Sequence, residues 1–386
     1  MPSLLDLARG LEPLVAAHRD RFDQDRGLPA PLVDAVRAAG LFGMWVPASM
    51  GGAELPPLDF LAVIEELARQ DGSFGWCVTI SAGYGRLAGA MPEPAARAVF
   101  GSGSGVLIGS LNPTGKAVAV PGGYRVTGHW TYGSFIAYGD WILGNCITED
   151  ASGPRQADDG GPEFRLCLFP RDAAEVFDIW HTGGLRATGS NDFAVADLFV
   201  PEDYSIPMPG FFPPPRHPGT LYAVPMPSTF VSCIATVCLG IARAAIESVV
   251  EIGAIKATTG TRTVLRDKPL AQVEMARAEA LLRAGRSYLF GELDAMWRDV
   301  RAGKTVPMRA RADVRLAACH ATQCAIQAVD IMYQLAGGAA LFQSGRLERC
   351  FRDIHAAGQH IAVSAQTNLE PVGRVLFGLP PGTARF

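Results

Sequence analysis

The chain has 386 residues, 48% of them hydrophobic and 19% charged, and its 34 basic and 38 acidic residues give a net charge of −4. This length and composition predict a soluble globular protein with several packed layers or sub-domains. No polybasic run is present, which argues against nucleic acid or an anionic membrane as the main partner. The eight cysteines form no CxxC pair and the N-terminus lacks the apolar run of a signal peptide. We therefore expect no disulfide framework, no metal site and a cytoplasmic location.

Residues 1–105 have a helical pattern and are expected to form an N-terminal helical domain. The stretch LPAPLVDAVRAAGLF has apolar residues at helical spacing, with Pro31 near its start and Gly40 near its end. PLDFLAVIEELARQDGS repeats this pattern with Asp71 and Gly72 as its terminator. EPAARAVFGSG predicts a short third helix.

Residues 106–206 change to a strand pattern and are expected to form a central β domain. In GYRVTGHWTYGS, residues 123–134, the alternation places five side chains on one side of a strand: Tyr124, Val126, Trp130, Tyr132 and Ser134. DWILGNC, RLCLFP and DFAVADLFVP are further short runs rich in branched and aromatic residues, as is typical of strands.

Residues 207–227 form a proline-rich connector, since nine prolines lie between Pro201 and Pro227. Such a segment enters neither a helix nor a central strand. Because Phe211 and Phe212 are embedded in it, we expect it to form the edge of a pocket. The alternative is a plain linker.

Residues 228–386 return to a helical pattern. Three long runs, which begin near Ser228, Gln272 and Arg311, combine with a final helix into a four-helix bundle. The uncharged stretch 222–242 contains prolines, serines and threonines, which indicates a buried helix rather than a membrane span. The order helical, β, helical is not βαβ alternation, and no GxGxxG or P-loop occurs, so a Rossmann-type nucleotide site is not expected.

The final helix is predicted over residues 351–361, FRDIHAAGQHI. His360 follows Asp353 by seven residues, so both side chains would lie on one helical face. The small residues AAG between them leave room for a flat molecule against the helix. The alternative for His360 is a hydrogen-bonded core histidine.

Five stretches in chain order carry a resemblance to a known family. They are GLFGMWVPASMGG with ELARQDGSFGWC, GGYRVTGHWTYGS, HTGGLRATGSNDFAVADLFVP, QLAGGAALF, and RLERCFRDIHAAGQHI. Over nearly its whole length the chain resembles the acyl-CoA dehydrogenase fold family, and more closely the flavin-dependent monooxygenases that share this fold. In the second stretch Phe135 replaces a glycine usual in this branch. The resemblance implies an α+β fold that is mainly α, with an N-terminal helical domain, a central β-barrel or sandwich and a C-terminal four-helix bundle.

The terminal helix departs from the dehydrogenases of this family. Many of them place a catalytic glutamate near the end of the helix that contains RD, where this chain has QHIA at residues 359–362 and no carboxylate. An amide or alkyl group cannot remove an α-proton. Glu247, Glu251 and Glu348 are alternative bases on other helices, unless they are solvated or ion-paired helix charges.

The resemblance therefore implies the oxygenase component of a two-component monooxygenase, with a homotetrameric assembly. A separate reductase would supply reduced FMN or FAD, which reacts with O₂ to a C4a-hydroperoxide that oxygenates a small aromatic or natural-product-like substrate. Two alternatives stay open. One is an acyl-CoA dehydrogenase or oxidase with a displaced base, and the other is a non-catalytic binding subunit of the same fold.

The same resemblance implies two catalytic residues. His360 would stabilise the hydroperoxide or assist deprotonation of the substrate. Ser134 would bond the flavin N5 region, or would only satisfy a turn. No catalytic role is expected for His355 or His129.

Further contacts are implied for the cofactor and the substrate. The expected cofactor residues are Ser110, Asn112, Trp130, Arg262 (with Arg266 equally suited), Gly337 and Gly338. Their alternatives are turn formers for the first two, a buried strand tryptophan for Trp130 and a helix C-cap for the glycines. The expected substrate walls are Trp76, Tyr84, Phe211 and Phe212.

Overall fold

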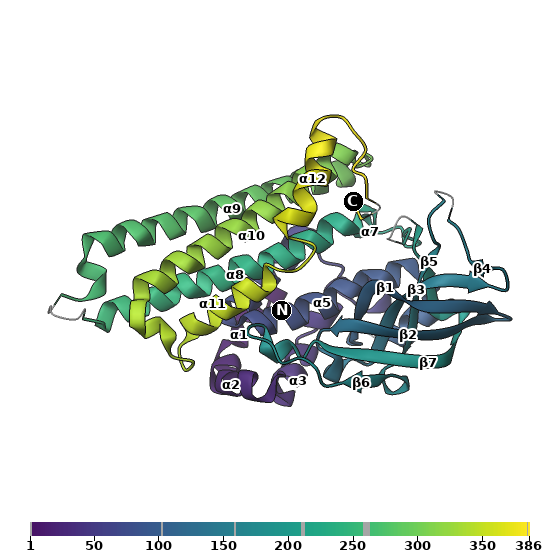
Figure 1. Cartoon of the computed structure of the whole chain (residues 1–386), viewed down its shortest axis with the longest axis horizontal. Coiled ribbons are helices and arrows are strands. Elements are labelled where there is room, and N and C mark those ends of the chain that lie inside the picture. The colour runs from purple at the N-terminus through teal and green to yellow at the C-terminus, as the bar shows by residue number, and fades with distance from the viewer. Residues whose placement is uncertain (1, 102, 158–159, 210–212, 258–262, 384) are drawn as a thin grey trace.

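The computed structural model describes every residue except 1, 102, 158–159, 210–212, 258–262 and 384. It consists of a group of N-terminal helices, a β-sheet at one end and a long helical bundle (Figure 1). The predicted order of helical, β and helical segments is confirmed. Phe211, Phe212 and Arg262 lie outside the described residues.

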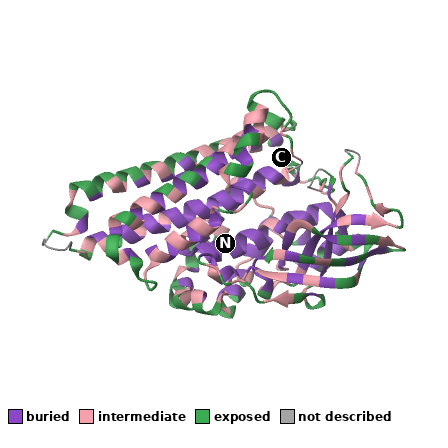
Figure 2. Cartoon of the chain, in the orientation of Figure 1, coloured by how far each residue is buried: buried purple, intermediate pink, exposed green. Residues whose placement is uncertain are grey.

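The N-terminal helices are α1 (Leu4–Gly10), α2 (Glu12–Asp25), α3 (Ala30–Ala38), α4 (Pro57–Gln70), α5 (Gly72–Tyr84) and α6 (Glu93–Phe100). Three of them, α3, α4 and α6, lie in the stretches that the sequence predicts to be helical. Gly40 follows α3 with a φ of 72°, a left-handed conformation that favours glycine. α4 ends before Asp71, whose carboxylate accepts the N–H of Phe74 (3.1 Å) and so caps α5. α5 is buried along almost its whole length (Figure 2).

The strands form one eight-stranded sheet with the order β6-β7-β2-β1-β3-β5-β8, and β4 pairs with β3. They are β1 (Leu107–Val120), β2 (Gly123–Gly133), β3 (Trp141–Asp150), β4 (Gly153–Pro154), β5 (Phe164–Pro170), β6 (Glu175–Phe177), β7 (Asn191–Pro201) and β8 (Ser205–Pro207). Neighbouring strands are antiparallel except for the parallel pair β1–β3. The long strands β1, β2 and β3 are therefore central, and the short β6 and β8 lie at the edges.

The predicted alternation in β2 is wrong at Tyr132. The pairing of β2 with β7 shifts register between Trp130 and Gly133. Tyr132 takes a φ of 64° within this irregularity, and 62% of its surface is exposed. A β-bulge of this kind turns a side chain out of the strand's alternation, so Tyr132 does not share a side with Trp130.

The C-terminal bundle is built around α8. Its helices are α7 (Thr220–Ala223), α8 (Met226–Ile255), α9 (Pro269–Arg301), α10 (Met308–Ala336), α11 (Arg346–Ala357) and α12 (Ala365–Leu376). α8 packs against α4, α5, α9, α10 and α11. Two segments, α8 and 308–341, are long and apolar enough to span a membrane, but 89% of the most apolar window of α8 is buried inside the protein. The expectation of a buried helix over this stretch is thus confirmed.

The predicted helix over residues 351–361 is wrong in its last turn. α11 ends at Ala357, residues 358–363 form turns, and α12 then begins at Ala365. The side chain of His360 contributes to this end, because its Nδ1 accepts the N–H of Ala362 (3.1 Å) and so competes with helical hydrogen bonding. His360 therefore lies in a turn and does not share a helical face with Asp353.

Candidate active site

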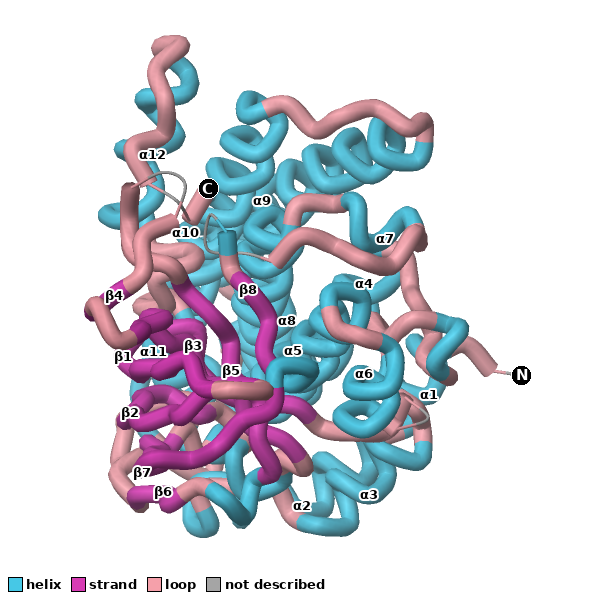
Figure 3. Tube along the Cα trace, turned by 90° about the vertical axis from the view of Figure 1, so that its right-hand side faces the viewer, coloured by secondary structure: helices cyan, strands magenta, loops and turns pink. Residues whose placement is uncertain are grey.

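One face of α5 organises the site. The face consists of Trp76, Thr79, Ile80, Gly83 and Tyr84, which follow the helical spacing i, i+3, i+4, i+7 and i+8. α5 contacts β1, α8 and α11, and Figure 3 shows it beside the sheet with the bundle behind. At one end of the face the Trp76 indole N–H donates to Ser134 Oγ (3.1 Å). At the other end the Tyr84 hydroxyl donates to the carbonyl of Gly109 on β1 (3.4 Å).

Four side chains form a hydrogen-bonded chain that starts at Trp76. Ser134 Oγ lies 2.8 Å from Ser190 Oγ, Ser190 Oγ lies 2.6 Å from Thr188 Oγ1, and Thr188 Oγ1 lies 2.8 Å from the carbonyl oxygen of Leu185. A carbonyl oxygen only accepts and an indole N–H only donates, so both ends fix the direction of the chain.

The direction determines what Ser134 can offer a ligand. Thr188 donates its single hydroxyl hydrogen to Leu185, so Ser190 donates to Thr188, and Ser134 donates to Ser190. The hydroxyl hydrogen of Ser134 is thereby used in the hydrogen bond to Ser190. Its oxygen accepts one hydrogen bond from Trp76 and has one lone pair left, so Ser134 acts toward a ligand only as an acceptor.

The backbone around Ser134 is strained. Tyr132 and Phe135 on either side have φ values of 64° and 66°, and neither is a glycine. Left-handed conformations of such residues cost about 1–3 kcal/mol each and cluster at binding sites. The exposed Tyr132 ring also lies edge-on to Trp180 (6.2 Å between centroids). A hydroxyl that can only accept, next in the chain to a segment with an exposed aromatic ring, fits a flat heteroaromatic group that carries an N–H.

His360 completes this side of the site. Its ring packs edge-on against Trp76 (5.5 Å between centroids) and Phe230 (5.7 Å). The backbone N–H of Ala362 can only donate, so Nδ1 is an acceptor and the hydrogen of the neutral ring sits on Nε2. Burial lowers the pKa of His360 to about 4, which keeps the ring neutral at physiological pH. The geometry therefore makes His360 a hydrogen-bond donor through Nε2 and argues against the expected role in deprotonation.

A small cavity, here called the inner cavity, lies between α5 and the beginning of α8. Its volume is about 20 Å³, room for about one water molecule. Tyr84, Ile80 and Thr79 line it together with Phe230 and Met226. Phe230 also contacts His360, so its ring lies between the inner cavity and the histidine. Of the two described residues predicted as substrate walls, Tyr84 lines the inner cavity, whereas Trp76 contacts Ser134 and His360.

Asp353 holds the chain of hydroxyls in place from α11. Its Oδ1 accepts the N–H of Leu185 (2.6 Å), the residue whose carbonyl ends the chain. Burial, reinforced by the nearby Asp71, raises the pKa of Asp353 to about 8. Gly72 is required beside it, since a Cβ there would lie 2.9 Å from Oδ2 of Asp353.

Trp130 lies in the core of the sheet rather than at a ligand surface. Its ring has no exposed area, its Nε1 donates to the carbonyl of Asn145 (2.8 Å), and it stacks on Phe193 (5.3 Å). A Cβ on Gly115 or Gly144 would lie within 2.6 Å of the ring. The structure therefore favours the alternative of a buried strand tryptophan.

The remaining expected cofactor residues fall into two places. Ser110 is buried and its Oγ accepts the N–H of Asn112 (3.3 Å), next to Gly109, which Tyr84 contacts. Gly337 and Gly338 instead follow α10 at the end of the bundle away from the sheet (Figure 1). Within one chain they are not brought together with Ser134 and His360.

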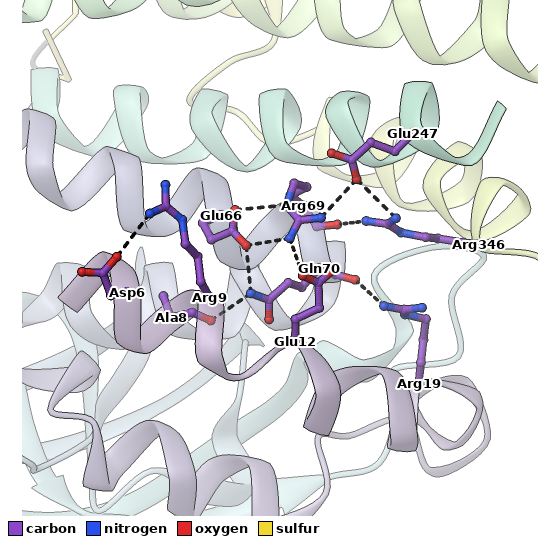
Figure 4. A network of polar contacts seen from close by, with 10 residues as sticks. All are labelled: Asp6, Ala8, Arg9, Glu12, Arg19, Glu66, Arg69, Gln70, Glu247 and Arg346. Atoms are coloured by element: carbon purple, nitrogen blue, oxygen red, sulfur yellow. Dashed lines mark hydrogen bonds and ion pairs between the residues drawn. The ribbon is translucent and has the colours of Figure 1, made fainter. Parts of the chain in front are cut away.

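The carboxylates considered as displaced bases are engaged elsewhere. Glu247 pairs with Arg69 (3.1 Å) and Arg346 (3.4 Å) in a network that joins α2, α4, α8 and α11 (Figure 4). Glu348 pairs with Arg352 (2.7 Å), and Glu251 is exposed. The two histidines for which no catalytic role is expected are paired with carboxylates, His355 with Asp330 and His129 with Asp192, each at 2.9 Å.

Three residues of the site were not singled out from the sequence. Thr188 and Ser190 lie in the TGSND stretch, so a signal was present in the motif. Phe230 lies in an uncharged helical stretch rich in apolar residues, and no pattern in the sequence marks it as a site residue.

Comparisons with known proteins agree along the whole chain. Residues 7–89 match the family model described as acyl-CoA dehydrogenase, N-terminal domain, and residues 232–365 match acyl-CoA dehydrogenase, C-terminal domain. The chain is 31% identical to an indole-3-acetate monooxygenase of Pseudomonas putida over 98% of this chain and 96% of the relative.

Two solved structures are similar over their full length. The crystal structure of the HsaA monooxygenase from M. tuberculosis has a TM-score of 0.89 and 28% identity, covering 100% of this chain and 99% of that one. The structure of XiaF from Streptomyces sp. in complex with FADH2 and glycerol has a TM-score of 0.89 and 27% identity, covering 98% and 96%.

Proposed function

The chain belongs to the flavin-dependent monooxygenases of the acyl-CoA dehydrogenase fold family, and on that premise we propose how its residues carry out the reaction. As an oxygenase component it transfers one atom of O₂ to an organic substrate, while the other atom leaves as water. The two electrons come from reduced flavin delivered by a separate reductase. When bound, the flavin supplies these electrons and activates O₂.

The observation that carries the proposal is that Ser134 donates its hydroxyl hydrogen to Ser190 and so can only accept a hydrogen bond from a ligand. The N5 atom of a reduced flavin is an N–H donor, whereas N5 of an oxidised flavin is an acceptor. An acceptor-only Ser134 matches the first and leaves two lone pairs facing each other in the second. Ser134 thereby favours the redox state that the reaction consumes.

His360 has the complementary role of a donor. Its Nε2–H stabilises negative charge that develops on oxygen during transfer, as a preorganised hydrogen-bond donor does. Trp76 and Phe230 shield the ring from water, which strengthens this hydrogen bond. Ser110 and Asn112 contact the pyrimidine part of the flavin, and Tyr84 bounds the substrate.

The finer features follow the same family resemblance. We propose a cytoplasmic homotetramer in which Gly337, Gly338 and an arginine, Arg262 (outside the described residues) or Arg266, contribute to binding the flavin tail held by another copy. Gly337 and Gly338 follow the end of α10 that points away from the sheet (Figure 1), whereas Ser134 directly follows β2, and this separation supports a contribution from a second copy. Both FMN and FAD are to be tested as cofactors.

The substrate is a small aromatic compound, and the names of relatives give the first compounds to assay. Indole-3-acetate is named for the Pseudomonas putida relative and resorcinol for a hydroxylase of Rhizobium sp.. In a single turnover, the protein is loaded anaerobically with reduced FMN or FAD and each compound, and ¹⁸O₂ is admitted. One labelled oxygen should appear in the hydroxylated product and the other in water.

The same preparation tests the alternatives. Recovery of all the oxygen as hydrogen peroxide with every aromatic compound, together with bleaching of a bound oxidised flavin by an acyl-CoA, would establish a dehydrogenase instead. Failure to bind flavin in either redox state would establish a binding subunit.

A further inference from the structure

A second, larger space opens on the proline-rich connector. This space, here called the connector groove, has a volume of about 390 Å³, the size of a small-molecule site. Its walls include Pro209, Pro213 and Pro215 of the connector, Tyr222, and Phe386, the last residue of the sequence. Two arginines, Arg86 and Arg311, line it, and no Asp or Glu is among its described lining residues.

Arg86 is a buried cation without a carboxylate partner among the described residues. Only 6% of its surface is exposed. Its guanidinium donates to Thr229 Oγ1 (2.5 Å) and to the carbonyl oxygens of Leu221 (3.1 Å) and Val224 (2.7 Å). These neutral acceptors satisfy three of the five N–H groups, and the guanidinium also lies over the ring of Trp45 (5.7 Å to its centroid), so no anion among the described residues balances the positive charge. A buried unpaired charge is costly, and an anion brought beside it is correspondingly favoured.

Arg311 is the second basic residue that lines the groove. It lies in the first turn of α10, and its buried Nε has no hydrogen-bond partner in the described part of the chain. None of the ion pairs among the described residues involves it. A cleft lined by one sign of charge raises the local concentration of the opposite ion.

The connector groove and the inner cavity share two lining residues, Arg86 and Met226. These two side chains therefore lie where the spaces meet. Methionine is unbranched and flexible, so a shift of Met226 can join the spaces without a change in the backbone. The inner cavity is also bounded by Phe230, whose ring separates it from His360.

We propose that the connector groove admits an anionic aromatic substrate and that Arg86 binds its carboxylate at the junction, so that the ring enters the enlarged inner cavity toward His360. This inference rests on the proposed function for its reaction but not for its binding step. It narrows the substrate class from small aromatic compounds to aromatic acids. It also assigns a binding residue and an access route that lie outside the flavin side of the site.

The test compares an acid with its neutral analogue on the unaltered protein. Binding of 1-naphthylacetate and of 1-naphthylacetamide is measured by titration calorimetry, once without flavin and once with excess reduced FMN under argon. The two probes have the same ring and nearly the same shape, so their difference reports the carboxylate. The acid should bind at least about tenfold more tightly in one of these states, as expected for a charge-assisted hydrogen bond.

Variants locate the effect. Arg86→Gln should abolish the advantage of the acid, Arg86→Lys should keep part of it, and Arg311→Gln should reduce it. Arg301→Gln, which removes an exposed charge at the end of α9, should leave it unchanged. If Arg86→Gln does not fold, as judged by its thermal transition, the inference is still tested by the binding of the two probes to the unaltered protein and to Arg311→Gln.

Three results would overturn the inference. The first is equal affinity for the acid and the amide, both without flavin and with reduced FMN, and the second is a preference for the acid that persists in folded Arg86→Gln. The third is displacement of bound 1-naphthylacetate by coenzyme A at a lower concentration than by unbound 1-naphthylacetate. The last would show that the groove takes the phosphates of a thioester rather than a carboxylate. Because binding is read without oxygen, these results are independent of whether the protein oxygenates anything. A failed turnover with a preserved acid preference would count against the proposed reaction alone.

Discussion

Replacing Ser190 by alanine should change which redox state of flavin the protein prefers, although we place Ser134 rather than Ser190 against the flavin. In the native chain of hydroxyls, Ser190 accepts the hydrogen of Ser134 (2.8 Å) and thereby makes Ser134 an acceptor. Ser190→Ala removes that acceptor, so the Ser134 hydroxyl can turn and donate to the N5 lone pair of an oxidised flavin. The contact with reduced flavin is kept, because Ser134 still accepts the N5–H.

The size of the effect follows from one hydrogen bond gained in one redox state. A neutral hydrogen bond contributes about 0.5–1.5 kcal/mol net, or about 2- to 13-fold in Kd. The Kd for oxidised FMN should fall by that factor while the Kd for reduced FMN changes little. The flavin-free variant should also lose about 1–3 kcal/mol of stability, since the buried Ser134 hydroxyl has lost its acceptor.

The assay is a fluorescence titration of the protein with oxidised and with reduced FMN and FAD, the latter under argon. Thr188→Val should act in the same direction, because it frees the hydrogen of Ser190 to point toward Ser134. Ser81→Ala is the matched control, a buried serine of α5 whose hydroxyl donates to its own helix at Cys77 (3.0 Å). If the ratio of the dissociation constants for oxidised and reduced flavin is unchanged in Ser190→Ala, the inferred direction of the hydrogen bonds from Ser134 to Leu185 is wrong.

Three further predictions concern His360 and Trp130. His360→Ala should lower the yield of hydroxylated product per reduced flavin about 100-fold and release hydrogen peroxide instead. His360→Gln should keep part of this yield, because its amide can donate a hydrogen bond. An unchanged yield in the alanine variant would show that His360 is not needed as a donor. Because the pKa of His360 is about 4 in the folded protein and near 6.5 when unfolded, the unfolded state binds more protons between these values. The native protein should therefore lose up to about 3 kcal/mol of stability relative to His360→Gln as the pH falls from 6.5 to 4, measured by urea denaturation at each pH; parallel pH profiles would show that the histidine is not held neutral. Trp130→Phe should lower the free energy of unfolding by about 2–4 kcal/mol, because it removes the hydrogen bond to Asn145 and leaves a cavity, yet the Kd for reduced flavin should not change. A higher Kd in folded protein would show that Trp130 contacts the cofactor.

Local sequence signals were sufficient for most of the scaffold. Gly40 ends its helix and Asp71 separates α4 from α5 because glycine and aspartate have strong conformational and capping preferences of their own. The alternation of β2 holds as far as Trp130, where one side of the strand is buried throughout. These features depend on neighbours in the sequence, and the sequence therefore reveals them.

Features that depend on contacts between distant segments could not be predicted. Tyr132 follows the alternation of β2 in the sequence but is turned outward by a register shift against β7. The run AAGQHI contains good helix formers, yet α11 ends at Ala357 and a side-chain contact within the following turn orients His360. In both cases the sequence pattern of the element continues past the residue at which the regular strand or helix ends.

The same limit applies to the candidate site. Motifs in the sequence singled out Ser134 and His360, but the roles that we propose for them, as acceptor and donor, depend on hydrogen bonds to Ser190 and Ala362 that only the fold supplies. Arg86 gave no signal, because α5 and the residues after it are buried on all sides and show no amphipathic pattern.

The preference for reduced over oxidised flavin tests the central claim most directly. The unaltered protein is titrated with FMN and FAD in both redox states under the same anaerobic conditions. The acceptor-only Ser134 predicts that at least one reduced flavin binds about tenfold or more tightly than its oxidised form. Equal affinity, or tighter binding of the oxidised form, would contradict the account.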